Sequence, residues 1–419
     1  MSRWELGISS AAPMINHWKA MQRLRLNLTL YSCNIHLDAN SCYAAWVPPA
    51  QPSRDHGGPV TKAALLHRQG RAIMAYVFGP VRSRRLGRSL GIDPIPLKTC
   101  NWNCVYCQLG RTVPLTNSRT EYCPAEAVLI KLRQALDISD GIDWITFVGS
   151  GEPTLHARIG WLIRQAKGLT DIPVAVITNG SLLHIPEVAQ ELAAADAVLP
   201  TLDAGDAALY RRINRPHPAL SYDSLRQGLI TFRHQYGGLF WLEVMLVKGL
   251  NDSESALQSL AAALGEIEPD EVHINVPFRA PAESWVRVPA RDTLRRAREL
   301  IGSRARLIDP APADFRTRRT NIVDSLAEVV ARHPLPEEEV RATFAVSGGD
   351  PDAAVGELAS DKRVARVERH GHVFWCPSRA TYAKRPADAI PVCKDSKHIR
   401  DITRNEANHD VTPERTDAT

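Results

Sequence analysis

The sequence predicts an α/β protein built around a parallel sheet, and three observations carry this prediction. The chain has 419 residues, of which 44% are hydrophobic and 23% charged, the balance of a globular protein with a large core. Between about Tyr76 and Pro310, strand-like apolar runs alternate six times with amphipathic helical windows. Small and polar residues follow several of these strands. Either an incomplete α/β barrel or an open doubly wound sheet would place the chemistry there.

The individual elements follow from the period of the apolar residues. Short apolar runs predict strands at 89–95, 144–148, 174–178, 197–202, 239–247 and 272–276. A helical period predicts helices at 125–136, 157–169, 185–194, 220–235, 253–264 and 290–302. Together they define a predicted core domain over residues 74–310.

A change of composition after Pro310 predicts a second unit. A basic segment at 316–319 is followed by helical windows at 322–332, 336–344 and 351–360 and by short apolar strands at 363–367 and 372–376. Three helices and a hairpin are typical of a winged-helix-like module, here over residues 311–380. Its third helix carries Asp352 and Glu357 and no Lys or Arg, a poor surface for phosphate contacts. We therefore expect this module to dock a protein or position a substrate.

The two ends of the chain lack a sustained period. Residues 1–73 are predicted to be a poorly ordered extension, with Met74 as a candidate start of translation, and residues 381–419 a disordered tail. The extension holds eight Lys and Arg against three Asp and Glu, so it alone accounts for the net charge of +5. A polyanion site would therefore be a local patch, such as Arg82, Arg84, Arg85 and Arg88. Without a long apolar run or secretory signal, we expect a cytoplasmic protein.

The strongest chemical signal is a cysteine cluster. Cys100, Cys104 and Cys107 follow the first predicted strand with the spacing C-x3-C-x2-C. This spacing lets three thiolates converge on one centre, and a [4Fe-4S] cluster held by three cysteines keeps one iron open for a ligand. Two alternatives remain: a structural zinc site with Cys123 as fourth ligand, and three unliganded cysteines.

With its surroundings, the cluster resembles the radical S-adenosylmethionine (SAM) superfamily, in a branch related to the wyosine-forming tRNA enzymes. The resemblance rests on the run GPVRSRRLGRSLG at 79–91, on the cysteines with Tyr106 and the following QLG at 108–110, and on GEPTL at 151–155. It implies a partial (β/α)6 barrel. It also implies that Cys100, Cys104 and Cys107 are the metal ligands of a catalytic [4Fe-4S] cluster whose fourth iron binds SAM.

The resemblance further implies a reaction. A one-electron reductant such as a flavodoxin or ferredoxin reduces the cluster, and SAM is cleaved to methionine and a 5′-deoxyadenosyl radical. The radical then abstracts hydrogen from an unidentified substrate, with a tRNA base as one candidate. A glycyl-radical activase acting on a protein is the alternative within the enzyme class. A non-catalytic, zinc-stabilised nucleic-acid-binding protein is the alternative outside it.

Cofactor contacts are expected at three later strand ends. Glu152 is expected to accept hydrogen bonds from the SAM ammonium group, although the same residue could simply start a helix. By resemblance, Thr178, Asn179, Thr201 and Asp203 lie near the SAM ribose and methionine, although these strand ends could instead be ordinary turns. Tyr106 is expected beside the adenine, although its ring could instead pack into the barrel mouth. The predicted cofactor-binding residues are Tyr106, Ser150, Gly151, Glu152, Thr178, Asn179, Thr201 and Asp203.

Several charged and polar residues near later strand ends are weaker candidates for clamping an acidic substrate. The two histidines nearby lack a metal-ligand partner at useful spacing, and we expect them to be structural. The clamp candidates are Arg211, Arg212, Asn214, Arg215, Lys248, Asn275 and Arg279, and the histidines are His217 and His273.

Overall fold

The computed structural model describes residues 76–308, 322–346 and 349–383. Over these residues one eight-stranded sheet runs in the order β1 to β8, the order of the sequence. β1 and β2 form an antiparallel hairpin, and each later strand is parallel to the one before it. The strands are β1 Val77–Ser83, β2 Gly87–Ile92, β3 Trp144–Phe147, β4 Val174–Ile177, β5 Ala197–Leu199, β6 Leu239–Met245, β7 Glu271–Asn275 and β8 Ala305–Leu307.

The strand order decides between the two predicted architectures. In a doubly wound sheet the order reverses at a switch point, whereas here every strand pairs with its neighbour in the sequence, as in an α/β barrel. β1 and β8 lie at opposite edges, so the barrel is incomplete. The predicted partial barrel is confirmed, with seven parallel strands instead of six.

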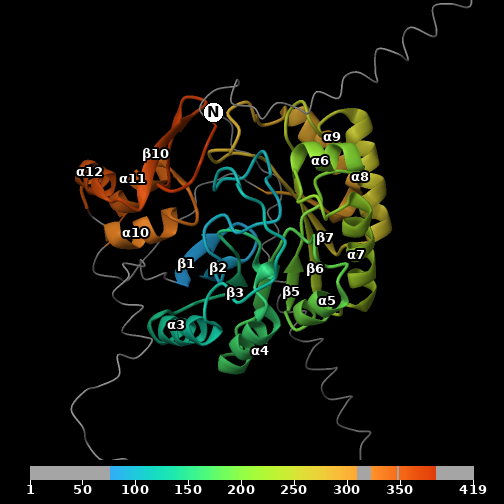
Figure 1. The fold of residues 1–419 in the computed structure, drawn as a ribbon. Coiled ribbons are helices and arrows are strands. Elements are labelled where there is room, and N and C mark those ends of the chain that lie inside the picture. The colour runs from blue at the N-terminus through green and yellow to red at the C-terminus, as the bar shows by residue number, and fades with distance from the viewer. Residues whose placement is uncertain (1–75, 309–321, 347–348, 384–419) are drawn as a thin grey trace, which may run out of the picture.

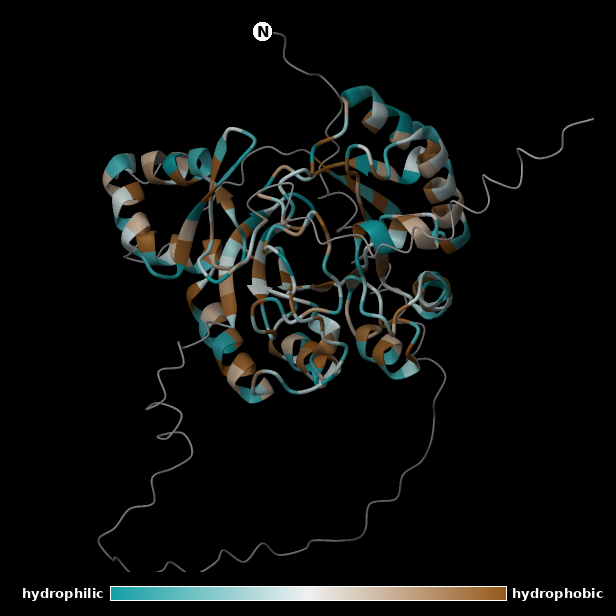
Figure 2. Ribbon diagram, turned by 45° about the horizontal axis from the view of Figure 1, so that its top comes forward, coloured by the Kyte–Doolittle hydropathy of each residue, from teal (hydrophilic) through white to brown (hydrophobic). Residues whose placement is uncertain are grey.

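Helices cover the outer face of this sheet (Figure 1). They are α3 Ala125–Ile138, α4 Ile159–Leu169, α5 Pro186–Leu192, α6 Ala207–Ile213, α7 Tyr222–Gln235, α8 Glu254–Ile267 and α9 Arg291–Ile301. The strands are largely apolar and the helices striped (Figure 2), because each helix buries one face in the main core. A smaller apolar cluster, including Leu86, Trp144 and Trp241, packs on the other face of the sheet. None of the helices in the described ranges is long and apolar enough to span a membrane.

The residues after 321 form a separate unit that we call the C-terminal module. It contains α10 Ile322–Val330, β9 Leu335–Pro336, α11 Glu337–Val346, α12 Pro351–Ser360, β10 Val364–Arg369 and β11 His372–Pro377. Its own core includes Leu326, Val340 and Trp375, and Val81 of β1 packs against it. Figure 1 shows the module beside β1, at the sheet edge far from α8. The three predicted helices and the hairpin are present.

The elements that sequence patterns missed are short. β8 has three residues, β9 two and α6 seven, too few to display a period. β1 was missed because Gly79 and Pro80 interrupt it at an irregularity in its pairing with β2. The predicted extension, the candidate start Met74 and the boundary at 310 lie outside the described residues.

The predicted start of the C-terminal tail needs correction. Residues 381–383 are placed and hydrogen-bonded to the core: the Arg111 amide donates to the Thr381 carbonyl (2.7 Å), and the Ala383 amide donates to the Ala282 carbonyl (2.9 Å). The ordered chain therefore continues past residue 380, and we call residues 378–383 the C-terminal segment.

Candidate active site

The three cysteines lie in the long loop that follows β2, the first parallel strand of the barrel. The end of α6 holds this loop through its backbone, because the Val105 amide donates to the Ile213 carbonyl (2.9 Å) and the Asn103 amide to the Asn214 carbonyl (3.0 Å). The buried Trp102 ring packs edge-on against Tyr210 of α6, with 5.4 Å between ring centroids. A helix that the sequence patterns missed thus positions the cysteine loop.

Each cysteine sulfur faces a nitrogen donor from a different part of the chain. Lys98 Nζ lies 3.1 Å from the Cys107 sulfur. Asn214 Nδ2 lies 3.7 Å from the Cys104 sulfur, and Asn179 Nδ2 lies 4.0 Å from the Cys100 sulfur. N–H donors and a neighbouring ammonium group favour the thiolate, which is the form that binds metal.

Burial opposes this stabilisation in the metal-free chain. It raises the pKa of Cys100 to about 12, although Lys98 partly offsets the effect. Burial, with the neighbouring Cys107 and Asp203, raises the pKa of Cys104 well above the ordinary thiol value. A coordinating metal deprotonates a thiol outright, so loading this site would release protons.

Cys123, the fourth ligand of the zinc alternative, forms no metal-binding group with the loop cysteines in the part of the chain that the structure describes. Cys123 is buried in the main core, and its carbonyl lies 2.9 Å from His156 Nε2. Within the described ranges, no group of three or more His, Cys, Asp or Glu side chains could hold one metal ion. A cubane [4Fe-4S] cluster does not need three ligands around one ion, because each of its three thiolates binds a different iron.

The Ser150-Gly151-Glu152 loop after β3 packs directly on the cysteine loop. The Lys98 amide donates to the Ser150 carbonyl (2.7 Å), and the Glu152 amide donates to the Thr99 carbonyl (2.9 Å). A Cβ atom on Gly151 would lie 1.8 Å from the Thr99 carbonyl oxygen. Only glycine permits this contact, so Gly151 lets its loop approach the backbone of the cysteine loop closely.

Glu152 is buried among neutral donors. Its Oε1 accepts hydrogen bonds from the Thr154 amide (3.0 Å), the Thr154 hydroxyl (2.6 Å) and the Thr178 hydroxyl (2.6 Å). Its Oε2 accepts from the Asn179 amide (2.7 Å). Burial raises the pKa of the Glu152 carboxyl, and these hydrogen bonds oppose the rise. Glu152 also caps the short 3-10 helix Pro153–Leu155, so the predicted helix start is present as well.

A second buried carboxylate, Asp203, follows β5. Its Oδ2 accepts from the Tyr106 hydroxyl (2.5 Å) and from Asn214 Nδ2 (2.6 Å), and its Oδ1 from the Met245 amide (2.7 Å). Burial raises the pKa of Asp203 to about 6. Thr201 lies nearby in the chain, where it forms an isolated bridge with Glu243 of β6.

The structure brings most of the predicted cofactor residues together. Glu152, Thr178 and Asn179 share hydrogen bonds, and Tyr106 joins Asp203. The Tyr106 ring packs against an apolar cluster that includes Val105, as the barrel-mouth alternative expects. The prediction that these residues contact SAM remains a prediction.

Both hydrogen-bond donors of Ser150 are bound by a residue that the sequence analysis did not single out. The buried Asp93, just after β2, accepts from the Ser150 amide (2.9 Å) and the Ser150 hydroxyl (2.6 Å). Lys98 was missed as well. Asn214, a clamp candidate, instead lies beside the Cys104 sulfur and donates to Asp203. Asp93 did carry a signal, since a carboxylate directly after a barrel strand is typical of functional sites.

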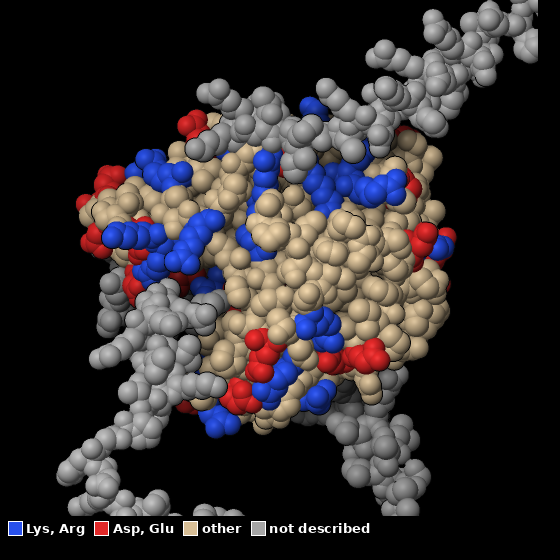
Figure 3. Space-filling view, in the orientation of Figure 1, with Lys and Arg blue, Asp and Glu red and all other residues tan. Residues whose placement is uncertain are grey.

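The arginine patch expected to bind a polyanion is partly internal. Arg85 pairs with Glu243 of β6, and the Arg84 guanidinium carbon lies 3.7 Å from the Phe278 ring centroid. Arg82 and Arg88 are exposed. Figure 3 shows basic side chains in separate groups on this face, which is not a continuous basic stripe. Two of the four arginines expected in such a patch are therefore half-buried and already have partners within the chain.

Three other clamp candidates also have internal partners. Asn275 donates to Glu243, and Arg279 is buried and donates to the Pro334 carbonyl. Arg215 joins Arg111 in binding the buried Glu283, with the Arg215 nitrogen 2.5 Å from one carboxylate oxygen. Arg211, Arg212 and Lys248 are exposed. His273 is buried on β7, 3.1 Å from a Glu271 oxygen.

Comparison with known proteins gives a family. The model of the Radical SAM superfamily matches residues 95–260, which include the three cysteines and all the predicted cofactor-binding residues. A UPF0026 protein of Methanocaldococcus jannaschii is 31% identical over 309 residues, covering 72% of this chain and 96% of that protein. A protein named GTPase Obg of Brachyspira hyodysenteriae is 36% identical over 282 residues, covering 67% of this chain. This chain spans only 42% of that relative's length.

Among solved structures, TYW1 with a lysine-pyruvate adduct bound is 13% identical with a TM-score of 0.37, covering 72% of this chain and 83% of that one. The family match covers the cysteine loop and the loops after β3, β4 and β5. The chain therefore belongs to the radical SAM superfamily and to the family of UPF0026 proteins.

Proposed function

We propose that this protein is a radical SAM enzyme in which Cys100, Cys104 and Cys107 hold a [4Fe-4S] cluster. The observation that carries the proposal is the set of three nitrogen donors, one for each cysteine sulfur. Structural thiols do not need such partners, whereas thiolates bound to a cluster are tuned by them. When bound and reduced, the cluster and SAM supply a carbon radical able to take hydrogen from an unreactive carbon.

The chain's own residues would stabilise the charge on the sulfurs and bind the cationic part of the ligand. Lys98, Asn179 and Asn214 stabilise negative charge on the sulfurs. Glu152 and Asp203 supply carboxylates that accept hydrogen bonds from neutral donors. A cationic ligand group, such as the SAM amino group, would complete their neutralisation. The apolar packing around the loops limits the access of water to these charges.

The inner face of the barrel offers polar groups for a substrate. Arg85, Glu243 and Asn275 form a connected set there. The buried His273 Nδ1 has no hydrogen-bond partner within the described ranges. A polar substrate that reaches this face would satisfy such an atom.

A tRNA base remains the first substrate candidate, and a protein, as for a glycyl-radical activase, the second. The second is favoured by α12, whose Asp352 pairs with Arg341 and which adds no basic side chain of its own. We also propose a one-electron donor of the flavodoxin or ferredoxin type as a partner.

The test is anaerobic. The cluster is reconstituted, dithionite and SAM are added, and 5′-deoxyadenosine is quantified for the wild type, Cys104→Ala and the control Cys123→Ala. We expect product from the wild type and from Cys123→Ala but not from Cys104→Ala. Zinc in place of iron, or a complete cluster that neither binds nor cleaves SAM, would contradict the proposal.

A further inference from the structure

The C-terminal module contacts the core at the residue that holds Ser150. Arg332, just after α10, donates from Nε to Asp93 Oδ2 (3.1 Å), the same oxygen that accepts the Ser150 hydroxyl (2.6 Å). The other oxygen of Asp93 accepts the Ser150 amide (2.9 Å). The Arg332 and Asp93 side chains are 13% and 2% exposed, so water screens this ion pair little. Arg332 therefore neutralises a carboxylate that fixes both the backbone and the side chain of Ser150.

The C-terminal segment contacts the other component of the site. The Tyr382 hydroxyl donates to the Gln108 carbonyl (2.5 Å), next to Cys107 in the sequence. The Arg111 amide donates to the Thr381 carbonyl (2.7 Å), and a Cβ atom on Gly110 would lie 2.5 Å from that carbonyl oxygen. The backbone of the C-terminal segment thus packs directly against the backbone of the cysteine loop.

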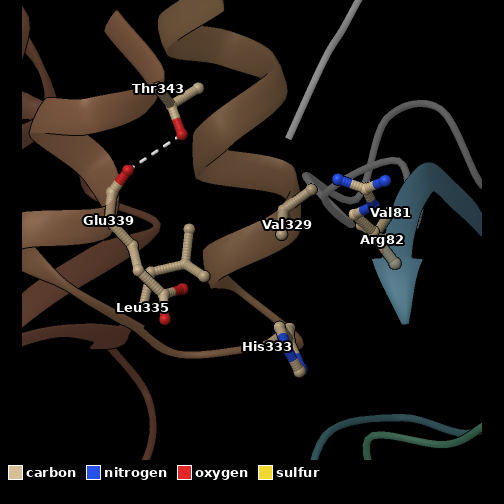
Figure 4. A pocket seen from close by; sticks show the side chains of 7 residues that line it. All are labelled: Val81, Arg82, Val329, His333, Leu335, Glu339 and Thr343. Carbon is tan, nitrogen blue, oxygen red and sulfur yellow. Dashed lines mark hydrogen bonds between the residues drawn. The ribbon is translucent and has the colours of Figure 1, made fainter. Parts of the chain in front are cut away.

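Between these two contacts the module is closely fitted to the core. Arg279 of the core donates to the Pro334 carbonyl and lies 3.6 Å from a Glu339 oxygen. Figure 4 shows a small pocket here, lined by Val81 and Arg82 of β1 and, from the module, by Val329, His333, Leu335, Glu339 and Thr343. Its volume of about 20 Å³ suffices for about one water molecule. The module therefore packs closely against β1.

We infer that the C-terminal module is part of the cofactor-binding apparatus, and that Arg332 is a positioning residue that holds the Ser150-Gly151-Glu152 loop through Asp93. This inference rests on the proposed function. Without Arg332, Asp93 would be a buried carboxylate with no ion-pair partner among the described residues, and either the carboxylate or the loop would shift to reach water. Because Ser150 and Glu152 share this loop, SAM affinity would fall. Any change that separates the module from β1 would lower SAM affinity in the same way.

The experiment compares Arg332→Gln and Arg332→Lys with the matched control Arg341→Gln. Arg341 forms its ion pairs with Glu337 and Asp352, both inside the module. SAM affinity is measured by equilibrium dialysis of the reconstituted protein without reductant, and iron per chain is measured alongside. We expect Arg332→Gln to weaken SAM binding by about tenfold, the scale of one charge-assisted contact. We expect unchanged iron, partial recovery in Arg332→Lys and wild-type affinity in the control.

A second readout does not depend on the cofactors. Amide hydrogen exchange of the cluster-free chain should become faster at Ser150 in Arg332→Gln and stay unchanged in Arg341→Gln. If the wild type fails to bind SAM, the proposed function falls, while this exchange result still decides whether Arg332 holds the loop. Wild-type SAM affinity and wild-type exchange in Arg332→Gln would overturn the inference.

If Arg332→Gln folds poorly, a double-mutant cycle with Asp93→Asn provides a further test. Once the charge of Asp93 has been removed, Arg332→Gln should weaken SAM binding little further. Fully additive effects of the two substitutions would show that they act separately, and would also overturn the inference.

Discussion

Two sets of buried carboxylates contact the cysteine loop, Glu283 in one and Glu152 with Asp203 in the other, and they have different kinds of hydrogen-bond donor. Glu283 receives Nε (3.0 Å) and a second guanidinium nitrogen (2.8 Å) of Arg111, and Arg215 completes the clamp. Burial alone would raise the pKa of Glu283, but the two arginines hold it below its ordinary value. Glu152 and Asp203 accept hydrogen bonds from neutral groups, and burial raises the pKa of both.

The difference separates scaffold from site. A carboxylate that serves only the fold is matched by cations from the same chain, as Glu283 is. Glu152 and Asp203 are buried without such a match, an arrangement that costs stability unless a ligand brings positive charge. Perturbed carboxyl groups of this kind are typical of functional sites. The same contrast yields experiments in which the two sets should respond in opposite ways.

The largest expected effect comes from breaking the clamp. Glu283→Gln leaves two partly buried guanidinium groups without their counter-charge, so the free energy of unfolding should fall by about 3 kcal/mol. Urea denaturation of the cluster-free chain measures it. The matched control is Glu254→Gln, which removes an exposed pair with Arg296 and should change little. An unchanged urea midpoint in Glu283→Gln would remove the distinction between scaffold and site.

The pH dependence of stability should separate the two sets next. The pKa of Asp203 rises from 3.8 to about 6 on folding, so the folded chain binds the proton more tightly than the unfolded chain does. Stability should therefore fall as the pH rises from about 4 to 6, by up to about 3 kcal/mol from this group. Glu283, with its lowered pKa, should add stability that is present above its unfolded value and lost on acidification.

The control for this prediction is Asp203→Asn, which has no proton to gain. Unfolding free energies at several values between pH 4 and 7 should decline less steeply in Asp203→Asn than in the wild type. Parallel curves for the two proteins would show that Asp203 does not carry the expected penalty.

Glu152→Gln should affect ligand binding more than stability. Glutamine keeps an acceptor for Thr154 and Thr178 and loses the one for the Asn179 amide, so the free energy of unfolding should fall by only about 1 kcal/mol. The affinity for SAM should fall by roughly tenfold or more, because a charge-assisted hydrogen bond is lost. Equilibrium dialysis and urea denaturation measure the two effects. Unchanged SAM affinity would mean that Glu152 serves only as the helix cap.

The smallest effect is expected at Cys123. Burial raises the pKa of Cys123 to about 11, and the side chain belongs to the main core. Cys123→Ala should leave iron content unchanged and lower the free energy of unfolding by about 1 kcal/mol, the scale of a small core deletion. Loss of iron in this variant would return Cys123 to the metal site.

Sequence patterns anticipated the barrel because most of its helices show an amphipathic period and most of its strands lie in short apolar runs. The cysteine motif likewise predicted the superfamily that the family match confirms, whereas the role of the three cysteines as metal ligands stays a prediction. The partners of the sulfurs could not be anticipated in this way. Lys98 holds a left-handed backbone with φ of 63°, and Asn214 reaches Cys104 across 110 residues of sequence. Those contacts depend on tertiary packing, which a local pattern does not encode.

The contact between Tyr382 and Gln108 has a consequence for synthesis of the chain. The two residues are separated by 274 positions. At translation rates of about 5 to 20 residues per second, the cysteine loop leaves the ribosome roughly 14 to 55 s before the segment that packs against it. During that interval the nascent thiols lack their final cover and are open both to oxidation and to delivery of iron. For the proposed cluster, we therefore expect insertion into the nascent chain to compete with oxidation of these thiols until the C-terminal segment has been made.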